Sequence, residues 1–327
     1  TPAASTGSDY ASLDPVVLRG ADSSGVGAAA QQLGELVAEK VDAITGGQLT
    51  VEYYPNSEMG GDMDIQQQML DGTLDYVVLQ TAPTVSFVPA VAVFDLPMVF
   101  AQYDGDTIDQ VLNGDDSEFL KAIAPKYEEK NMKILGYLQN ATYRLTTSNV
   151  KLDTLDAFKG LQIRTMENQN HMAFWSALGA APTPLAWAEV FISLQNGTID
   201  AQENAADTCA STNFQEVQKY LACTNHILYA NQLSMNKEKY DSLDPAYQEA
   251  INQAVAEAIE EMKSQMVESD ETNKQTLVDG GMTLIEYDDA FFQEILALDT
   301  VQALYDKIDA DVNGLGTTLQ EELAAQG

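Results

Sequence analysis

Apolar positions along the chain follow two alternating spacings. Between residues 33 and 44 they fall three or four positions apart, as in a helix with one buried face, and Gly46 and Gly47 follow where that helix should end. The runs "PVVLRGADSSG", "LTVEYYP" and "DYVVLQ" are separated by helical segments and indicate strands. This alternation of strand and helix predicts a mostly parallel sheet covered by helices.

The same alternation returns in the middle of the chain. Strands are predicted for "KILGYLQ", "YRLTTS" and "GLQIRT", and helices for "NHMAFWSALG" and "AEVFISLQNG". The stretch "SLQNGTIDAQEN" echoes the earlier "MLDGTLDYVVLQ": each ends a helix with a glycine and turns through Thr and Asp into a strand. We therefore expect two similar α/β units, with shared cap chemistry as the alternative explanation of the echo.

The longest helical pattern begins after Asp244, a suitable cap, and ends before Gly280. Pro245 suits its first turn, and apolar residues between 247 and 266 form a stripe along one face. If unbroken, the helix runs for roughly 50 Å at 1.5 Å per residue. That exceeds the width of a small domain, and 327 residues suffice for two domains. We expect the helix to lie along both, with a ligand cleft between them.

Composition excludes several partners. The chain has 16 Lys and Arg against 50 Asp and Glu, a formal charge of −34, which would repel nucleic acid and anionic lipid. The longest apolar run, "FVPAVAVFDLPMVF", is broken by Asp95 and two prolines and is shorter than the roughly 20 residues of a membrane helix. We expect neither nucleic acid nor a membrane span.

No constellation for catalysis or for a metal is visible. His171 and His226 fall in no metal or triad pattern, and no nucleotide-binding glycine motif is present. We therefore expect no cofactor and no metal, and this favours binding over turnover. Cys209 and Cys223 are expected to be free and buried.

Arginine is rare in this chain: Arg19, Arg144 and Arg164 stand against thirteen lysines. A guanidinium offers a planar fork of donors that matches a carboxylate, whereas lysine is a flexible point charge. Strand alternation places Arg164 on a polar face in "GLQIRT", and Arg144 likewise in "TYRLTT". From the residues alone a structural ion pair explains either arginine as well as a ligand clamp does.

The stretch "FKGLQIRT…FWSALGAAPTPLAWAEVFISLQNGTIDAQEN" resembles the central signature of the solute-binding proteins of tripartite ATP-independent periplasmic (TRAP) transporters, which include C4-dicarboxylate, sialic acid and uronate binders. Further similar stretches are "VEYYPNSEMGGDMDIQQQMLDGTLD", "AVFDLPMVF" and "EVQKYLACTNHIL". The similarity runs from about residue 17 to near residue 295. It implies two α/β domains, each a mixed sheet flanked by helices, with a long helix spanning both and a closing cleft that captures an organic anion.

The resemblance also implies roles for particular residues. Arg164 would form the bidentate bridge to the ligand carboxylate, Arg144 and Asn204 would assist, and Trp187 would form an aromatic pocket wall or else a core aromatic. The family often has proline where this chain has Ala205. Three further residues fall at positions that face the pocket: Asp22, Gln80 and Glu167. His171 is unusual for the family and is either a specificity residue or an exposed helical residue.

These expectations combine into a function and a domain plan. The favoured ligand is a hydroxylated monocarboxylate such as a uronate or aldonate, because the candidate pocket groups accept from hydroxyls and would repel a second carboxylate. C4-dicarboxylate, sialic, amino and aromatic acids stay open, as do an enzyme acting on a carboxylate and an adhesion protein. The expected domains are 14–140 plus about 230–268, and 141–229 plus about 269–327.

The expected setting is outside the cytoplasm. Residues 1–13, beginning "TPAASTGSD", are interpreted as a flexible leader or tether that follows a processing site, with a trimmed end as the alternative. The protein would be periplasmic or lipid-anchored, monomeric, and would deliver its ligand to the membrane permease subunits of a TRAP transporter.

Overall fold

Two mixed β-sheets organise the protein, and they contain the strands that the sequence predicted together with further ones. The computed structural model describes residues 10–327, so the expected leader sequence at residues 1–9 lies outside the described residues. The first sheet contains β1 (Val16–Asp22), β2 (Leu49–Tyr54), β3 (Tyr76–Gln80), β4 (Met132–Leu138) and β10 (Asn231–Asn236). The second contains β5 (Leu145–Ser148), β6 (Gln162–Thr165), β7 (Ala181–Pro184), β8 (Ala201–Asn204), β9 (Tyr220–Ala222) and β11 (Thr283–Ile285).

The expectation of mostly parallel pairing is wrong for part of each sheet. The first sheet has the order β2-β1-β3-β10-β4, and β10 runs antiparallel to both of its neighbours. The second has the order β11-β9-β5-β8-β6-β7, and β5 is antiparallel to β8 and β9. The chain crosses between the sheets before β5 and again before β10, so each of these two antiparallel strands enters its sheet from the other one.

Helices cover both sheets, and their ends follow the cap chemistry of the sequence. Helix α1 (Ala29–Thr45) ends at Gly46, whose φ of 60° lies in the left-handed region and whose N–H donates to the Asp42 carbonyl. The other helices near the sheets are α2 (Asp62–Leu70), α3 (Thr81–Thr84), α4 (Gly105–Asn113), α5 (Glu118–Glu128), α6 (Gln169–Ala177), α7 (Trp187–Gln195), α8 (Ala206–Ser211) and α9 (Lys237–Ser242). Four 3₁₀ segments, η1 to η4, lie at Tyr10–Ser12, Pro89–Asp95, Leu155–Phe158 and Phe214–Glu216.

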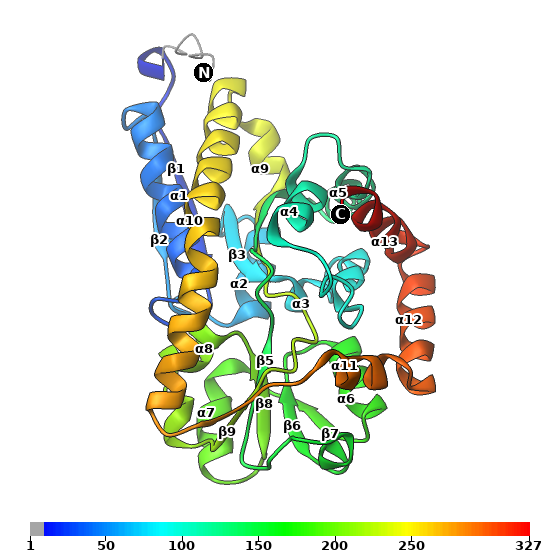
Figure 1. Cartoon of the computed structure of the whole chain (residues 1–327). Helices are drawn as coiled ribbons and strands as arrows, with labels where there is room; N and C mark the ends of the chain where they lie inside the picture. Colours follow the sequence, from blue (N-terminus) through cyan, green and yellow to red (C-terminus); the bar gives the residue numbers. More distant parts are fainter. Residues whose placement is uncertain (1–9) are drawn as a thin grey trace.

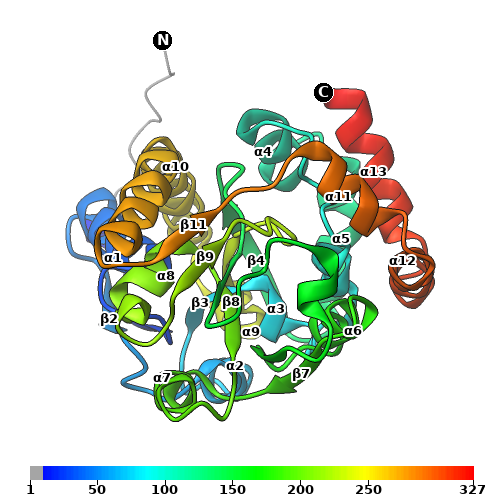
Figure 2. The ribbon, with the colours of Figure 1, turned by 60° about the horizontal axis from the view of Figure 1, so that its bottom comes forward.

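The long helix predicted from the sequence is present and joins the two sheets. Helix α10 (Pro245–Asp279) has 35 residues, or about 52 Å, and Asp244 caps it by accepting from the Ala246 N–H at 2.9 Å. It packs on α1 and β4 of the first unit and on α8 and β9 of the second. In Figure 1 it runs along the whole left side of the molecule, and Figure 2 shows it leading directly into β11.

The C-terminal helices were expected in the second domain, but they also pack on helices of the first sheet. The domain boundaries remain a prediction. Helices α11 (Asp289–Leu296), α12 (Asp299–Asp311) and α13 (Leu315–Gln326) follow β11. Helix α13 packs on α4 and α5, and α12 contacts both η2 and α6. The last part of the chain therefore returns to the first sheet's helices, as Figure 1 shows on the right-hand side.

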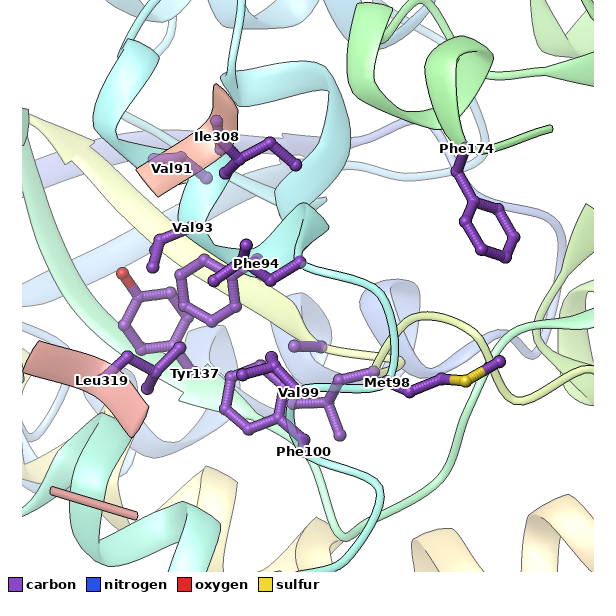
Figure 3. Close-up of a cluster of buried hydrophobic side chains, with 14 of the residues drawn as sticks. Val91, Val93, Phe94, Met98, Val99, Phe100, Tyr137, Phe174, Ile308 and Leu319 are labelled. Carbon is purple, nitrogen blue, oxygen red and sulfur yellow. The ribbon is translucent and has the colours of Figure 1, made fainter. Parts of the chain in front are cut away.

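The main apolar core lies where η2, β4 and the C-terminal helices meet. Phe94 is at its centre: its ring lies 5.2 Å from that of Tyr137 and 6.0 Å from those of Phe100 and Phe119. Figure 3 shows this cluster, with Leu319 of α13 reaching it. The broken run "FVPAVAVFDLPMVF" thus contains the 3₁₀ segment η2, and its residues 91–100 are buried. In residues 10–327 no helix combines the length and the apolarity required to cross a bilayer.

Candidate functional site

A narrow cavity lies between the two sheets, and both contribute to its walls. It has about 40 Å³ of free space, well below the roughly 300–1,000 Å³ of typical small-molecule pockets. The polar residues on the first-sheet wall are Ser23, Ser24, Asp62, Gln80 and Asn231. The second-sheet wall carries Arg164, Met166, Trp187, Asn204 and Thr208. The walls are therefore close together, and an organic acid enters only when they move apart.

Arg164 presents one edge of its guanidinium to this cavity. It lies on β6 between β7 and β8, and its side chain is buried although it follows the apolar Ile163. Its Nε and Nη2 both donate to the Leu185 carbonyl, at 3.0 and 2.7 Å. Its buried Nη1 has no hydrogen-bond partner among the described residues. Because Nη2 carries a second hydrogen, Nη1 and Nη2 together form a free fork for a carboxylate.

The surroundings of Arg164 make an anion favourable there. Burial lowers the pKa of Arg164 to about 10, which still leaves it charged at neutral pH. The Trp187 ring lies 5.5 Å from its Cζ, so the aromatic face holds the guanidinium plane. A buried cation with an unsatisfied donor is costly, and a ligand carboxylate would remove that cost. Trp187 therefore contributes to the pocket wall, and it also packs against Phe214 in the core at 5.7 Å.

Asn204 is oriented by two donors. Its Oδ1 accepts from Gln80 Nε2 at 3.1 Å and from the Ala205 backbone N–H at 2.9 Å. The side-chain Nδ2 therefore remains as a donor towards the cavity. The second bond requires an N–H at residue 205, which a proline would lack. In this chain the Ala205 N–H therefore orients the Asn204 amide by a hydrogen bond, in place of the rigid proline that the family often has at position 205.

Arg144 lies behind the cavity. Its Nε pairs with the Glu203 carboxylate, its Nη2 donates to the Glu203 carbonyl at 2.8 Å, and its Nη1 donates to Gln80 Oε1. Both partners in this ion pair are almost fully buried. The structural ion pair considered from the sequence is therefore present, and Arg144 reaches the cavity only through Gln80 and Asn204.

His171 is buried, so the alternative of an exposed helical residue is wrong. It lies in the first turn of α6, where Asn168 caps the helix. Its Nε2 lies 3.2 Å from Asp95 Oδ1 and its Nδ1 lies 3.3 Å from Glu203 Oε1. Burial disfavours the imidazolium, but hydrogen bonds with Asp95 and Glu203 outweigh it and raise the pKa of His171 to about 9. The residue bridges two carboxylates and does not line the cavity.

Two further expected residues lie beside the cavity. Asp22 is fully buried, and its carboxylate accepts from the Ser24 N–H at 2.8 Å and from the Tyr53 hydroxyl at 2.9 Å. It thereby holds the loop that presents Ser23 and Ser24 to the cavity. Glu167 is exposed and is absent from the cavity lining.

Sequence reasoning missed four polar residues of the first-sheet wall: Ser23, Ser24, Asp62 and Asn231. Ser23 was discoverable, since it directly follows the candidate Asp22. Asp62 lies in the acidic stretch "GGDMD", whose composition is typical of a solvated turn, and Asn231 had no local signal. Its position comes from β10, which pairs Asn231 with Gln80.

The groups needed for metal chemistry are not gathered in the part of the chain that the structure describes. No set of three His, Cys, Asp or Glu side chains in residues 10–327 is placed to hold a metal ion. Cys209 and Cys223 are both free and buried, as expected.

Residues 20–311 match a known family, the bacterial extracellular solute-binding proteins, family 7. The chain belongs to this family. It is 31% identical to a solute-binding protein from Verminephrobacter eiseniae over 83% of this chain and 79% of that one. It is 30% identical to a 2,3-diketo-L-gulonate-binding periplasmic protein from Escherichia coli, over 77% and 73% of the two chains.

A solved structure supports the same assignment. A TRAP periplasmic solute-binding protein from Chromohalobacter salexigens, with bound D-glucuronate, aligns with a TM-score of 0.84 at 26% identity over 93% of this chain and 99% of that one. The resemblance to the solute-binding proteins of TRAP transporters is thus confirmed, and so is the expected two-sheet fold with its spanning helix. Members of family 7 are periplasmic binding proteins of TRAP transporters without enzymatic activity, so the enzyme alternative does not hold.

Proposed function

We propose that this solute-binding protein captures a hydroxylated monocarboxylate, a uronate or aldonate, between its two domains. The observation that carries the proposal is Arg164: its fork is free, and it is the only basic side chain among the residues that line the cavity. One carboxylate pairs with it, and a second carboxylate would meet Asp62 instead of a cation. The 2,3-diketo-L-gulonate-binding and D-glucuronate-bound relatives support a sugar acid.

The proposed mechanism is capture by closure. The ligand carboxylate pairs with Arg164 on the second-sheet wall, and Asn204 donates its Nδ2 to the ligand. The first-sheet wall then closes on it while α10 keeps the domains together. Closure removes water, and the charge-assisted hydrogen bonds become stronger in the resulting low-dielectric site. The closed protein, a monomer, then docks on the permease subunits; a lipid anchor at the leader remains a prediction.

A thermal-shift screen tests the ligand class. The panel contains D-glucuronate, D-galactonate, succinate, sialic acid, an amino acid and an aromatic acid. A bound acid raises stability by RT ln(1 + [L]/Kd), about 2.7 kcal/mol at a hundred times Kd. We expect D-glucuronate and D-galactonate to give the largest shifts. A larger shift with succinate would overturn the monocarboxylate assignment, and no shift with D-glucuronate or D-galactonate would overturn the sugar-acid assignment.

A further inference from the structure

Three polar side chains of the first-sheet wall, those of Asn231, Asp62 and Ser23, line the cavity opposite Arg164. Asn231 is fully buried, and neither its Nδ2 nor its Oδ1 has a hydrogen-bond partner among the described residues. Tyr229 lies next to it: burial raises the pKa of Tyr229, and an interaction with the Asn231 amide acts to lower it, but the geometry is poor because the Tyr229 hydroxyl donates to Asp207 Oδ2 at 2.9 Å. An unsatisfied buried amide costs on the order of 1–3 kcal/mol, which a ligand with donors and acceptors would offset.

Asp62 and Ser23 form a second polar group on the same wall. Asp62 is the first residue of α2, and its Oδ1 accepts a hydrogen bond from the Ser23 hydroxyl. Burial raises the pKa of Asp62, and the Ser23 hydrogen bond and the charge of Arg164 counteract that rise. A carboxylate with free acceptor capacity suits a hydroxyl and disfavours another carboxylate.

The loop that carries Ser23 is fixed in place. The Asp22 carboxylate accepts hydrogen bonds from the backbone N–H and the hydroxyl of Ser24. Ser57 donates its hydroxyl to the Ser23 carbonyl at 2.9 Å. Ser23 itself is only 8% exposed. Its hydroxyl is thus held at the cavity by the surrounding backbone, as a selective contact requires.

We propose that Asp62, Ser23 and Asn231 bind the hydroxyl groups of the ligand while Arg164 holds its carboxylate, and that they are the specificity-determining residues of this protein. The inference rests on the proposed function. It assigns the two ends of the ligand to the two domains: the acid group to the second sheet and the polyol to the first. A ligand without hydroxyls would leave Asn231 unsatisfied, and a dicarboxylate would place its second charge beside Asp62.

Calorimetric titration of three probes tests this assignment. D-glucuronate has the carboxylate and hydroxyls, cyclohexanecarboxylate has the carboxylate without hydroxyls, and succinate has two carboxylates. The variants are Asp62→Asn, Ser23→Ala and Asn231→Ala, with Asp64→Asn as the matched control. Asp64 lies in the same turn of α2 but is exposed and only caps the helix.

We expect the wild-type protein to bind D-glucuronate at least tenfold more tightly than either other probe. Asp62→Asn and Asn231→Ala should each weaken D-glucuronate about tenfold or more, Ser23→Ala less, and Asp64→Asn by less than threefold. Asp62→Asn should also shift the ratio of succinate to D-glucuronate affinity towards succinate, which a merely destabilised protein would not do.

The outcomes separate this inference from the proposed function. If the wild type binds D-glucuronate and Arg164→Ala abolishes binding while all three wall variants bind normally, the hydroxyl assignment is wrong and the proposed function stands. If the wild type binds none of the sugar acids of the thermal-shift panel, both fail. Normal folding of each variant is checked by its unfolding midpoint.

Discussion

Replacing His171 by glutamine should remove stability in a way that depends on pH. The side chain lies between Asp95, from η2 beside the first sheet, and Glu203, from β8 of the second sheet. Glu203 also contacts Arg144 and the Nε2 of His226, at 3.1 Å for the latter. Burial lowers the pKa of His226, so two carboxylates face two cations, Arg144 and protonated His171. This buried group is electrically balanced only when His171 carries its proton.

The magnitude follows from the pKa. His171 has a reference pKa of 6.5 and a value of about 9 in the folded protein. A difference of about 2.5 pKa units corresponds to about 3 kcal/mol at about 1.4 kcal/mol per unit. Because the folded value is the higher one, this stability is complete below about pH 6.5 and disappears as the pH rises through about 9.

The assay is urea unfolding of the wild type and His171→Gln at pH 6 and pH 10. Titrations of groups away from this buried cluster cancel in the difference between the two proteins, and that difference should shrink by about 3 kcal/mol at the higher pH. A double variant, Asp95→Asn with His171→Gln, removes both charges and should be less destabilised than the sum of the single variants. A wild-type advantage that is equal at both pH values would refute the reasoning.

Three other predictions concern packing, thiols and the orientation of Asn204. Gly34→Ala should cost about 1–3 kcal/mol in urea unfolding, because a Cβ there would overlap the Tyr53 hydroxyl; an unchanged midpoint would contradict this packing. Cys209 and Cys223 should react with a thiol reagent only after unfolding, and a reductant should leave the melting temperature unchanged; a shift would indicate a disulfide. Ala205→Pro suits the local φ of −69° but removes the N–H that fixes Asn204, so D-glucuronate affinity should fall about two- to fivefold with little loss of stability, whereas unchanged affinity would remove that role.

Local patterns predicted most of the elements, because each is determined by residues close together in the chain. In each of the two similar sequence stretches, a glycine in the left-handed backbone region ends a helix before a strand. These glycines are Gly72 (φ 76°), before β3, and Gly197 (φ 69°), before β8. Asp244 and Pro245 likewise determine where α10 begins. Strand direction was beyond such reasoning, since β10 pairs with strands that precede it by about 100 residues or more.

Candidate site residues could be predicted where the residue type itself suggests a ligand, as arginine suggests a carboxylate. The rarity of arginine indicated Arg164, and strand alternation indicated a polar side. The same reasoning could not separate Arg164 from Arg144, because the buried Glu203 that pairs with Arg144 comes from another strand. Asn231 enters the cavity through a strand crossing from the other domain, and its importance appears only as unsatisfied atoms in the folded protein.

Calorimetry of D-glucuronate binding to Arg164→Lys measures whether the Arg164 fork holds the ligand carboxylate. Lysine keeps the charge and loses the planar fork. We expect Arg164→Lys to lose about 2–4 kcal/mol of binding free energy, on the order of 100-fold in affinity, with unchanged folding. Binding by Arg164→Lys within threefold of the wild type would contradict this expectation.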